Sequence, residues 1–219
     1  MHERRPNPRK NRDVFLNIPY DNRFRRLYIA YISGLIHLGL KPRATIEIPG
    51  SRNRIEKIIE LIRSCAFSIH DLSRVELDIH KPRTPRFNMP FELGLAVAFD
   101  SENRQESFPA AQSQPRSDYF VFESVNRRFE KSLSDLKGLD AYIHDGTVAG
   151  VMRELCNAFV RQAIDEQVSV LEMMKTYREV SKLADEIQRR SRANSLFEAS
   201  VFKQLNFAAF VAAGIPSKR

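Results

Sequence analysis

Short apolar runs alternate along the chain with segments in which apolar side chains recur every three or four positions. The first run, residues 13–18, precedes a segment whose large apolar residues share one helical face and which ends at Gly39. Similar runs at residues 44–48 and 66–70 enclose a second helical pattern over residues 55–62. This alternation is typical of strands joined by helices, so the pattern predicts a strand–helix–strand–helix–strand unit.

The alternation continues to residue 144. Residues 88–99 are mostly apolar and predict a buried helix, whereas the polar segment at residues 101–117 predicts a loop. Apolar runs at residues 119–122 and 141–144 predict two more strands, and residues 129–136 between them predict a short helix. Parallel strands need crossovers, and the expected crossovers are helical. The sequence therefore predicts a doubly wound, flavodoxin-like α/β fold with a parallel sheet of about five strands.

The strand pattern stops near Thr147, and only helical spacing follows. We expect a domain over residues 13–146 and an all-helical region over residues 147–219, which either packs on the domain or mediates self-association into a homo-oligomer. Residues 1–12 contain five basic residues and one acidic residue, a net charge of +4 out of the formal +8 of the chain. We expect a disordered, solubilising tail there. It can touch phosphates nonspecifically, but it has no aromatic side chain for stacking, so nucleic acid is not the favoured partner.

Several classes of protein are excluded by what the sequence lacks. The longest mostly apolar run, residues 29–40, is too short to span a bilayer, and no signal-peptide pattern opens the sequence. Cys65 and Cys156 lie in apolar stretches and match no metal-ligand spacing, which favours buried free thiols in a reducing, cytoplasmic compartment. Glycine-rich phosphate loops, HExxH and Cys/His clusters are absent, so no metal or resident cofactor is expected.

Polar residues that follow the predicted strands are the candidates for a site. Loops at the carboxyl ends of parallel strands share one edge of the sheet, where ligands bind in open α/β folds. The candidates from the first and third strands and from the following helix are Tyr20, Asp21, Asp71, Ser73, Arg74 and Glu92. We expect these side chains to converge on one pocket. A turn-forming role for Asp71 and a core-covering role for Tyr20 are the structural alternatives.

Glu92 is the sharpest candidate because it is the single ionisable residue within residues 89–99. A lone carboxylate in an apolar segment is costly to bury, so we expect it to have a polar or charged partner or a functional role. Its expected place in the first turn of a helix favours the ionised form, which suits a nucleophile or an acceptor for sugar hydroxyls. Gly94 nearby would let a ligand or a backbone approach closely. The alternative is a carboxylate that only caps the helix or interacts with its dipole.

Two segments together resemble a known superfamily. Asp13-Val-Phe-Leu-Asn-Ile-Pro-Tyr-Asp-Asn22, followed by an amphipathic helix, resembles the opening of Toll/interleukin-1 receptor (TIR) domains. Asp71-Leu-Ser73 paired with Asn88-Met-Pro-Phe-Glu-Leu-Gly94 is similar to the pattern shared by bacterial TIR-like proteins and nucleoside 2-deoxyribosyltransferases, in which a Glu-Leu-Gly helix start carries the catalytic carboxylate. The resemblance covers residues 13–145 and leaves the helical region unmatched.

The resemblance implies that Glu92 acts at the ribose of an N-glycosidic bond. In the transferases the matching residue attacks the anomeric carbon, and in the TIR enzymes it holds the ribose hydroxyls while NAD loses nicotinamide. Asp71 and Asn88 would then orient the sugar or base, and Tyr20 would flank the ring. The chain has no tryptophan, which many TIR enzymes carry near the glutamate, and it lacks the glycine usual between the two transferase motifs. These departures leave the base and the retention of activity open.

Three hypotheses follow. The first is an N-glycosidase that acts on NAD or a related nucleotide or nucleoside, which the resemblance implies is a hydrolase of bacterial antiviral defence or stress responses. The second is a non-catalytic nucleotide-binding sensor that signals through its helical C-terminal region. The third is a protein-interaction module. Nucleotide turnover distinguishes the first from the second. A stable complex with another protein chain, with neither nucleotide binding nor turnover, favours the third.

Overall fold

The computed structural model describes residues 11–50, 53–74, 81–82, 84–104, 118–160 and 168–215. Residues 1–10 of the predicted tail and residues 105–117 of the predicted loop lie outside the described residues. The described chain forms one five-stranded parallel sheet in the order β2-β1-β3-β4-β5. The strands are β1 (Asp13–Asn17), β2 (Lys41–Ala44), β3 (Phe67–Asp71), β4 (Asp118–Glu123) and β5 (Tyr142–Ile143). This confirms the doubly wound α/β fold.

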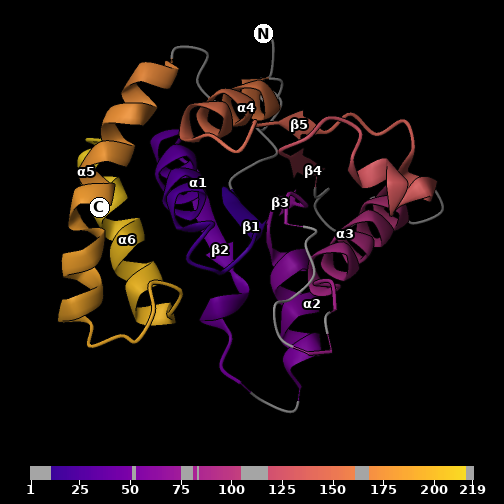
Figure 1. Cartoon of the computed structure of the whole chain (residues 1–219), viewed down its shortest axis with the longest axis horizontal. Helices are drawn as coiled ribbons and strands as arrows, with labels where there is room; N and C mark the ends of the chain where they lie inside the picture. The colour runs from indigo at the N-terminus through magenta and orange to yellow at the C-terminus, as the bar shows by residue number, and fades with distance from the viewer. Residues whose placement is uncertain are drawn as a thin grey trace, which may run out of the picture.

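Helices cover both faces of the sheet, as Figure 1 shows. The helices are α1 (Arg25–His37), α2 (Arg54–Ser64), α3 (Asn88–Arg104), α4 (Val148–Val160), α5 (Val170–Arg190) and α6 (Ala199–Ala212). Alternating side chains of β1 divide the core: Val14 and Leu16 pack with α1 and α4, whereas Phe15 packs with α2 and α3. The alternation is the period-two geometry of a strand buried on both faces.

The strand order places a switch point between β1 and β3. The crossover from β1 leads outward to β2, and the next crossover returns to β3 on the other side of β1. The connections after β1 and β3 therefore leave the sheet in opposite directions, and ligands of open α/β folds bind at such a point. Tyr20, Asp21, Ser73 and Arg74 follow these two strands, and Asp71 ends β3.

The C-terminal helices share one core with the α/β unit. α5 and α6 pack against α1 and bury Met173, Val180 and Leu205 in the same apolar cluster as the sheet. At Gly34 of α1, a Cβ atom would lie 2.6 Å from Leu155 Cδ1, so the absence of a side chain permits the close approach of α4. These helices therefore pack on the domain. α4 begins after the predicted boundary at residue 147, yet it packs on the sheet that precedes this boundary.

Some predicted elements differ from the observed ones. The second strand ends at Ala44, and residues Thr45–Glu47 form a 3-10 turn, η1, instead of continuing the predicted strand. The Glu47 carboxylate accepts the Ala44 N–H at 2.7 Å and closes this turn. The predicted short helix after β4 is two 3-10 turns, η2 (Phe129–Lys131) and η3 (Ser134–Leu136).

The start of the described chain also differs from the prediction. Asn11 and Arg12 were assigned to the predicted tail, but the Asn11 amide donates to the Ser64 carbonyl oxygen at 2.7 Å and the Arg12 carbonyl oxygen accepts the Lys41 N–H at 2.8 Å. These two residues are therefore tied to the beginning of the sheet.

Candidate functional site

Glu92 lies on α3 at the carboxyl edge of the sheet, with its side chain only 6% exposed. α3 begins at Asn88, so Glu92 is its fifth residue and lies just beyond the first turn, in which the sequence places it. The helix start is held by Asn17 at the end of β1, whose amide nitrogen donates to the Met89 carbonyl oxygen at 2.8 Å. The position of Glu92 is thus fixed by a contact between β1 and the first turn of α3.

A buried histidine supports this contact. The Asn17 amide nitrogen also lies 2.9 Å from His70 Nδ1, and His70 Nε2 lies 3.1 Å from the Ser68 hydroxyl. Burial lowers the pKa of His70 to about 3, so the ring is neutral at physiological pH. His70 is therefore a structural residue that helps β3 to orient Asn17.

Burial raises the pKa of Glu92 to about 7, and the positive charge of Arg54 acts in the opposite direction. The sequence predicts that the helix N-terminus favours the ionised form of this carboxyl, whereas burial favours the neutral form. The effect of the helix end falls off beyond the first turn, and Glu92 lies beyond that turn. Desolvation therefore dominates its pKa. Within the part of the chain that the structure describes, the Glu92 carboxyl has no hydrogen bond or ion pair.

Tyr20 and Arg54 are the described residues whose electrostatic effects link them to Glu92. The Tyr20 hydroxyl donates to the Leu16 carbonyl oxygen at 3.0 Å and also interacts with the Thr45 side chain. Burial, together with the charge of Glu92, raises the pKa of Tyr20. The Arg54 guanidinium donates to the carbonyl oxygens of Ile48 at 2.9 Å and Thr45 at 3.2 Å. The structure therefore groups an acid, a phenol and a cation from three elements.

Asp21 holds both sides of the connection between β3 and α3. Its Oδ1 accepts the N–H groups of Arg23 at 2.9 Å and Phe24 at 3.1 Å, which starts α1. Its Oδ2 lies 3.6 Å from an Arg74 nitrogen and 3.3 Å from an Arg86 nitrogen. Arg74 follows β3 and Arg86 precedes α3. One carboxylate from the loop after β1 thus gathers two guanidinium groups at the carboxyl edge of the sheet.

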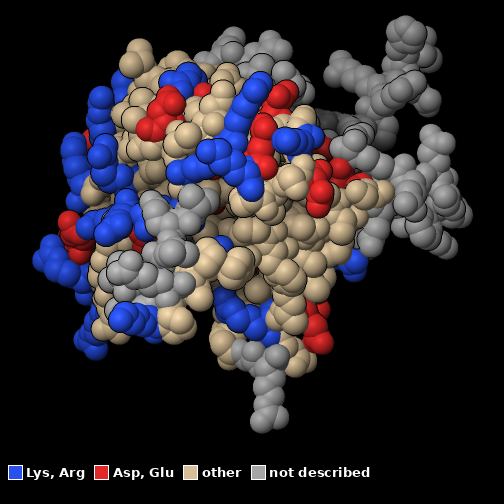
Figure 2. Space-filling view, turned by 45° about the vertical axis from the view of Figure 1, so that its right-hand side comes forward, with Lys and Arg blue, Asp and Glu red and all other residues tan. Residues whose placement is uncertain are grey.

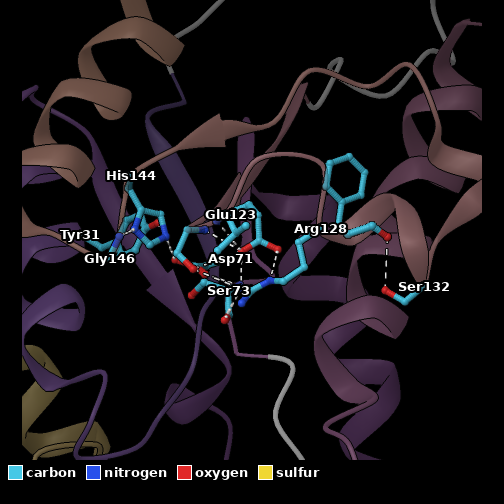
Figure 3. Close-up of polar contacts among 11 residues, drawn as sticks. Tyr31, Asp71, Ser73, Glu123, Arg128, Ser132, His144 and Gly146 are labelled. Atoms are coloured by element: carbon cyan, nitrogen blue, oxygen red, sulfur yellow. Dashed lines mark hydrogen bonds and ion pairs between the residues drawn. The ribbon is translucent and has the colours of Figure 1, made fainter.

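Asp71 belongs to a different, fully buried network, shown in Figure 3. Its Oδ2 accepts the Tyr31 hydroxyl at 2.7 Å and lies 3.2 Å from His144 Nε2. Its Oδ1 accepts the Ser73 N–H at 2.9 Å. His144 Nδ1 in turn accepts the Gly146 N–H at 3.1 Å. These contacts use Asp71 inside the protein, so the arrangement gives it a positioning role and does not place it against a ligand.

A second network fixes Ser73 from the side of β4. Arg128 donates to the Ser73 carbonyl oxygen at 2.6 Å and binds the buried Glu123 carboxylate at 2.5 Å (Figure 3). Glu123 also accepts the Ser124 N–H at 2.6 Å. Ser73 is thereby held through both its N–H and its carbonyl group. Sequence reasoning missed Glu123, Arg128 and His144, although the charged residue at the end of an apolar strand, Glu123, was a usable signal.

The remaining predicted residue, Asn88, is exposed at the start of α3. Two aromatic side chains beside it are also exposed, Phe87 at 69% and Phe91 at 55%. They are four residues apart, and the Phe91 N–H donates to the Phe87 carbonyl oxygen at 3.0 Å. Exposed aromatic rings at the start of α3 offer apolar surface to a flat ligand. Their helical spacing was visible in the sequence but was not used.

The site has no metal-binding character in the described part of the chain, where no group of three or more His, Cys, Asp or Glu residues could hold an ion. No described helix combines the length and the apolar composition required to cross a membrane. On the face shown in Figure 2, acidic side chains lie between the basic ones. Comparisons with family models and with curated proteins find no match for this chain.

Proposed function

We propose that the protein is an N-glycosidase that cleaves the bond between ribose and base in NAD or a related nucleotide or nucleoside. The observation that carries the proposal is Glu92: a buried carboxyl at the switch point of the sheet, without a hydrogen-bond partner among the described residues and with its pKa raised to about 7. A titratable group perturbed by burial in this position is a typical feature of a functional site.

The proposed reaction needs a fixed negative charge beside the sugar. The bond between C1′ and the base nitrogen breaks, and its electron pair leaves with the base. Positive charge then develops at C1′ before a water oxygen bonds there and releases a proton. The ionised Glu92 carboxylate stabilises this charge or accepts hydrogen bonds from the ribose hydroxyls. Because the carboxylate form is required, activity should rise with pH through about 7.

The other residues take supporting roles in this proposal. Arg74 and Arg86, gathered by Asp21, supply positive charge for a phosphate group of the ligand. Asn88 contacts the sugar or base, and Tyr20 borders the ring. The buried Asp71 and Ser73 networks position the loop after β3 and do not touch the substrate.

The test is turnover by the full chain and by Glu92→Gln. Chromatography of NAD, NADP and deoxynucleosides should show release of nicotinamide or a free base by the native protein and none by the variant. Glu60→Gln, which removes an exposed carboxylate from α2, should retain the native rate. Absence of turnover of every substrate by the native protein would contradict the proposal.

Stability measurements show whether the variant remains folded. Between pH 4.5, the ordinary pKa of glutamate, and pH 7, the folded state holds the Glu92 proton more tightly than the unfolded state does. Native stability therefore falls as pH rises through this window, and Glu92→Gln removes the loss. We expect the variant to be more stable above pH 7, by on the order of 1–3 kcal/mol, and equal to the native protein below pH 4.5. Urea denaturation at pH 4 and pH 8 measures both differences.

A second candidate function is a nucleotide sensor without turnover, because one contact leads from the site to the C-terminal helices. The Tyr20 ring lies 6.2 Å from the ring of Phe197, in the connection between α5 and α6, and 6.1 Å from that of Tyr28 on α1. A ligand that moved Tyr20 would disturb this aromatic cluster. Saturable NAD binding by calorimetry, with no product formed, would favour the sensor over the enzyme.

The proposal extends to partners and location. The ligand is a nucleotide, the chain self-associates through its C-terminal helices, and the protein acts in the cytoplasm as an effector of antiviral defence or stress. The candidate surface for this self-association lies on α5 and α6.

A further inference from the structure

A cavity of about 540 Å³ lies between the free edge of the sheet and α6, away from Glu92. Its apolar wall is formed by Ile36, Leu40, Pro42, Phe202, Phe210 and Ile215. The volume is within the range of sites that take small organic molecules, and such sites are mostly apolar with a few polar groups. None of the residues named for the proposed function lines this cavity.

The neighbouring edge of β2 is unsuited to another strand. In the parallel ladder, Lys41 and Arg43 direct their backbone groups toward β1, as the bond from the Lys41 N–H to the Arg12 carbonyl oxygen indicates. Pro42 and Ala44 face outward. Proline has no N–H group, and the Ala44 N–H is already bound by Glu47 at 2.7 Å. Both outward donors of the edge are thus missing or used, which disfavours strand addition by a peptide.

The polar lining of the cavity is mainly basic. Lys41, Arg43 and Lys203 carry three positive charges against the single negative charge of Glu47. Arg43 is bound by Asp13 at 2.8 Å and by Glu47 at 3.2 Å, so its charge is neutralised within the wall. Lys203 is exposed on α6 and makes no ion pair with a described carboxylate. An anionic group of a ligand is the complement of this uncompensated charge.

We propose that this cavity binds a small amphipathic carboxylate, with its apolar body between β2 and α6 and its carboxylate beside Lys203. The apolar side chains of Phe202 and Phe210 supply the burial, and Lys203 supplies the preference for an anion over a neutral or cationic molecule of the same shape.

The sequence provides a direct reporter because it contains no tryptophan. Phe210→Trp places a single indole in the cavity wall, where Phe210 is half-buried. Titration of this full-length variant with decanoate should give a saturable change in fluorescence with one site per chain. Phe207→Trp is the matched control, because Phe207 is exposed on the same helix and does not line the cavity. Its emission should not change over the same range.

Calorimetry with the native chain tests the charge. Lys203→Glu should weaken decanoate binding by about tenfold or more, whereas Arg178→Glu, the same reversal at an exposed position on α5, should not. Decylamine, which has the same chain and the opposite charge, should bind much more weakly. Equal binding of decanoate by native protein and Lys203→Glu, equal binding of decylamine, or no binding of decanoate would each overturn the proposal.

A final arm separates this site from the proposed active site. Glu92→Gln should bind decanoate with native affinity, because Glu92 does not line the cavity. Loss of NAD turnover together with retained decanoate binding would therefore leave this proposal intact, and loss of decanoate binding in Glu92→Gln would show that the two sites are one.

Discussion

Two tyrosines one turn apart on α1 show how the same burial acts differently on two hydroxyl groups. Tyr28 and Tyr31 are both fully buried. The Tyr31 hydroxyl donates to Asp71 at 2.7 Å, whereas the Tyr28 hydroxyl has no hydrogen-bond partner among the described residues. Burial raises the pKa of both groups, and the charge of Asp71 raises that of Tyr31 further. Only one of the two hydroxyls therefore contributes to the buried network beside the site.

The two corresponding variants should differ in stability. Tyr31→Phe leaves Asp71 without its shortest hydrogen bond, and we expect a loss of about 1–3 kcal/mol in the free energy of unfolding. Tyr28→Phe removes a hydroxyl that gains no bond on folding, and we expect no loss or a small gain. Urea denaturation of both variants at the same pH measures the difference. Equal losses would show that ring packing, and not the bond to Asp71, sets the cost.

At the scale of elements, two helical glycines have opposite surroundings. No described atom lies within 4 Å of a Cβ built at Gly94, inside α3. A Cβ at Gly150, in the first turn of α4, would lie 2.0 Å from the His144 carbonyl oxygen. Gly150 therefore permits α4 to start directly against the end of β5. Gly94 meets no protein backbone, so within the described residues its lack of a side chain serves no packing role.

Alanine substitutions should change stability in opposite directions. Gly94→Ala should stabilise the protein by about 0.5–1 kcal/mol, because it lowers the backbone entropy lost on folding. Gly150→Ala should destabilise it by about 1–3 kcal/mol or more, because the backbone of His144 must move away from Asp71. Chemical denaturation measures both effects. A loss of stability in Gly94→Ala would contradict the open space seen beside α3.

At the scale of the whole molecule, α6 is apolar on two faces. Val201, Leu205 and Ala209 are buried against the rest of the protein, yet Phe207 and Val211 on the other face are 70% and 62% exposed. With neighbouring residues of α5, the exposed pair lines a groove of about 460 Å³. A helix that is apolar all round is normally covered. The protruding Phe207 and the groove lie on one surface, as a two-fold contact between identical chains requires.

The charged residues of this groove are already paired within one chain. Glu179, Glu186 and Arg190 line it from α5. Arg190 forms an ion pair with Glu186, and Glu179 forms one with Lys182 at 2.8 Å. The proposed self-association therefore rests on the burial of the exposed apolar residues.

Light scattering coupled to size-exclusion chromatography tests this surface. The native chain should elute as a dimer at micromolar concentrations, and Phe207→Asp should shift the mass to that of a monomer, because a charge would be buried in the contact. Leu171→Asp is the control, since Leu171 is 74% exposed at the start of α5 but does not line the groove. A monomeric native chain, or a dimer unaffected by Phe207→Asp, would contradict the proposal.

The order of strands and helices along the chain, and the edge of the sheet where Glu92 lies, could be predicted from the residues alone. Both follow from local patterns: apolar runs mark buried strands, helical spacing marks the crossovers, and parallel strands bring their following loops to one edge. The isolation of Glu92 among apolar residues was equally visible. The end of β2 was not, because it depends on the bond from the Ala44 N–H to the side chain of Glu47 in competition with a strand-like sequence.

Only the tertiary structure decided the state and the neighbours of the candidate residues. The raised pKa of Glu92 depends on how completely α2, α3 and the loop after β1 exclude water, and the burial of Asp71 depends on Tyr31 and His144, which are distant from it in the chain. The cavity beside Lys203 likewise requires α6 to pack along β2. These properties arise from desolvation and from contacts between remote segments, whereas the helix and strand pattern arises from neighbours in sequence.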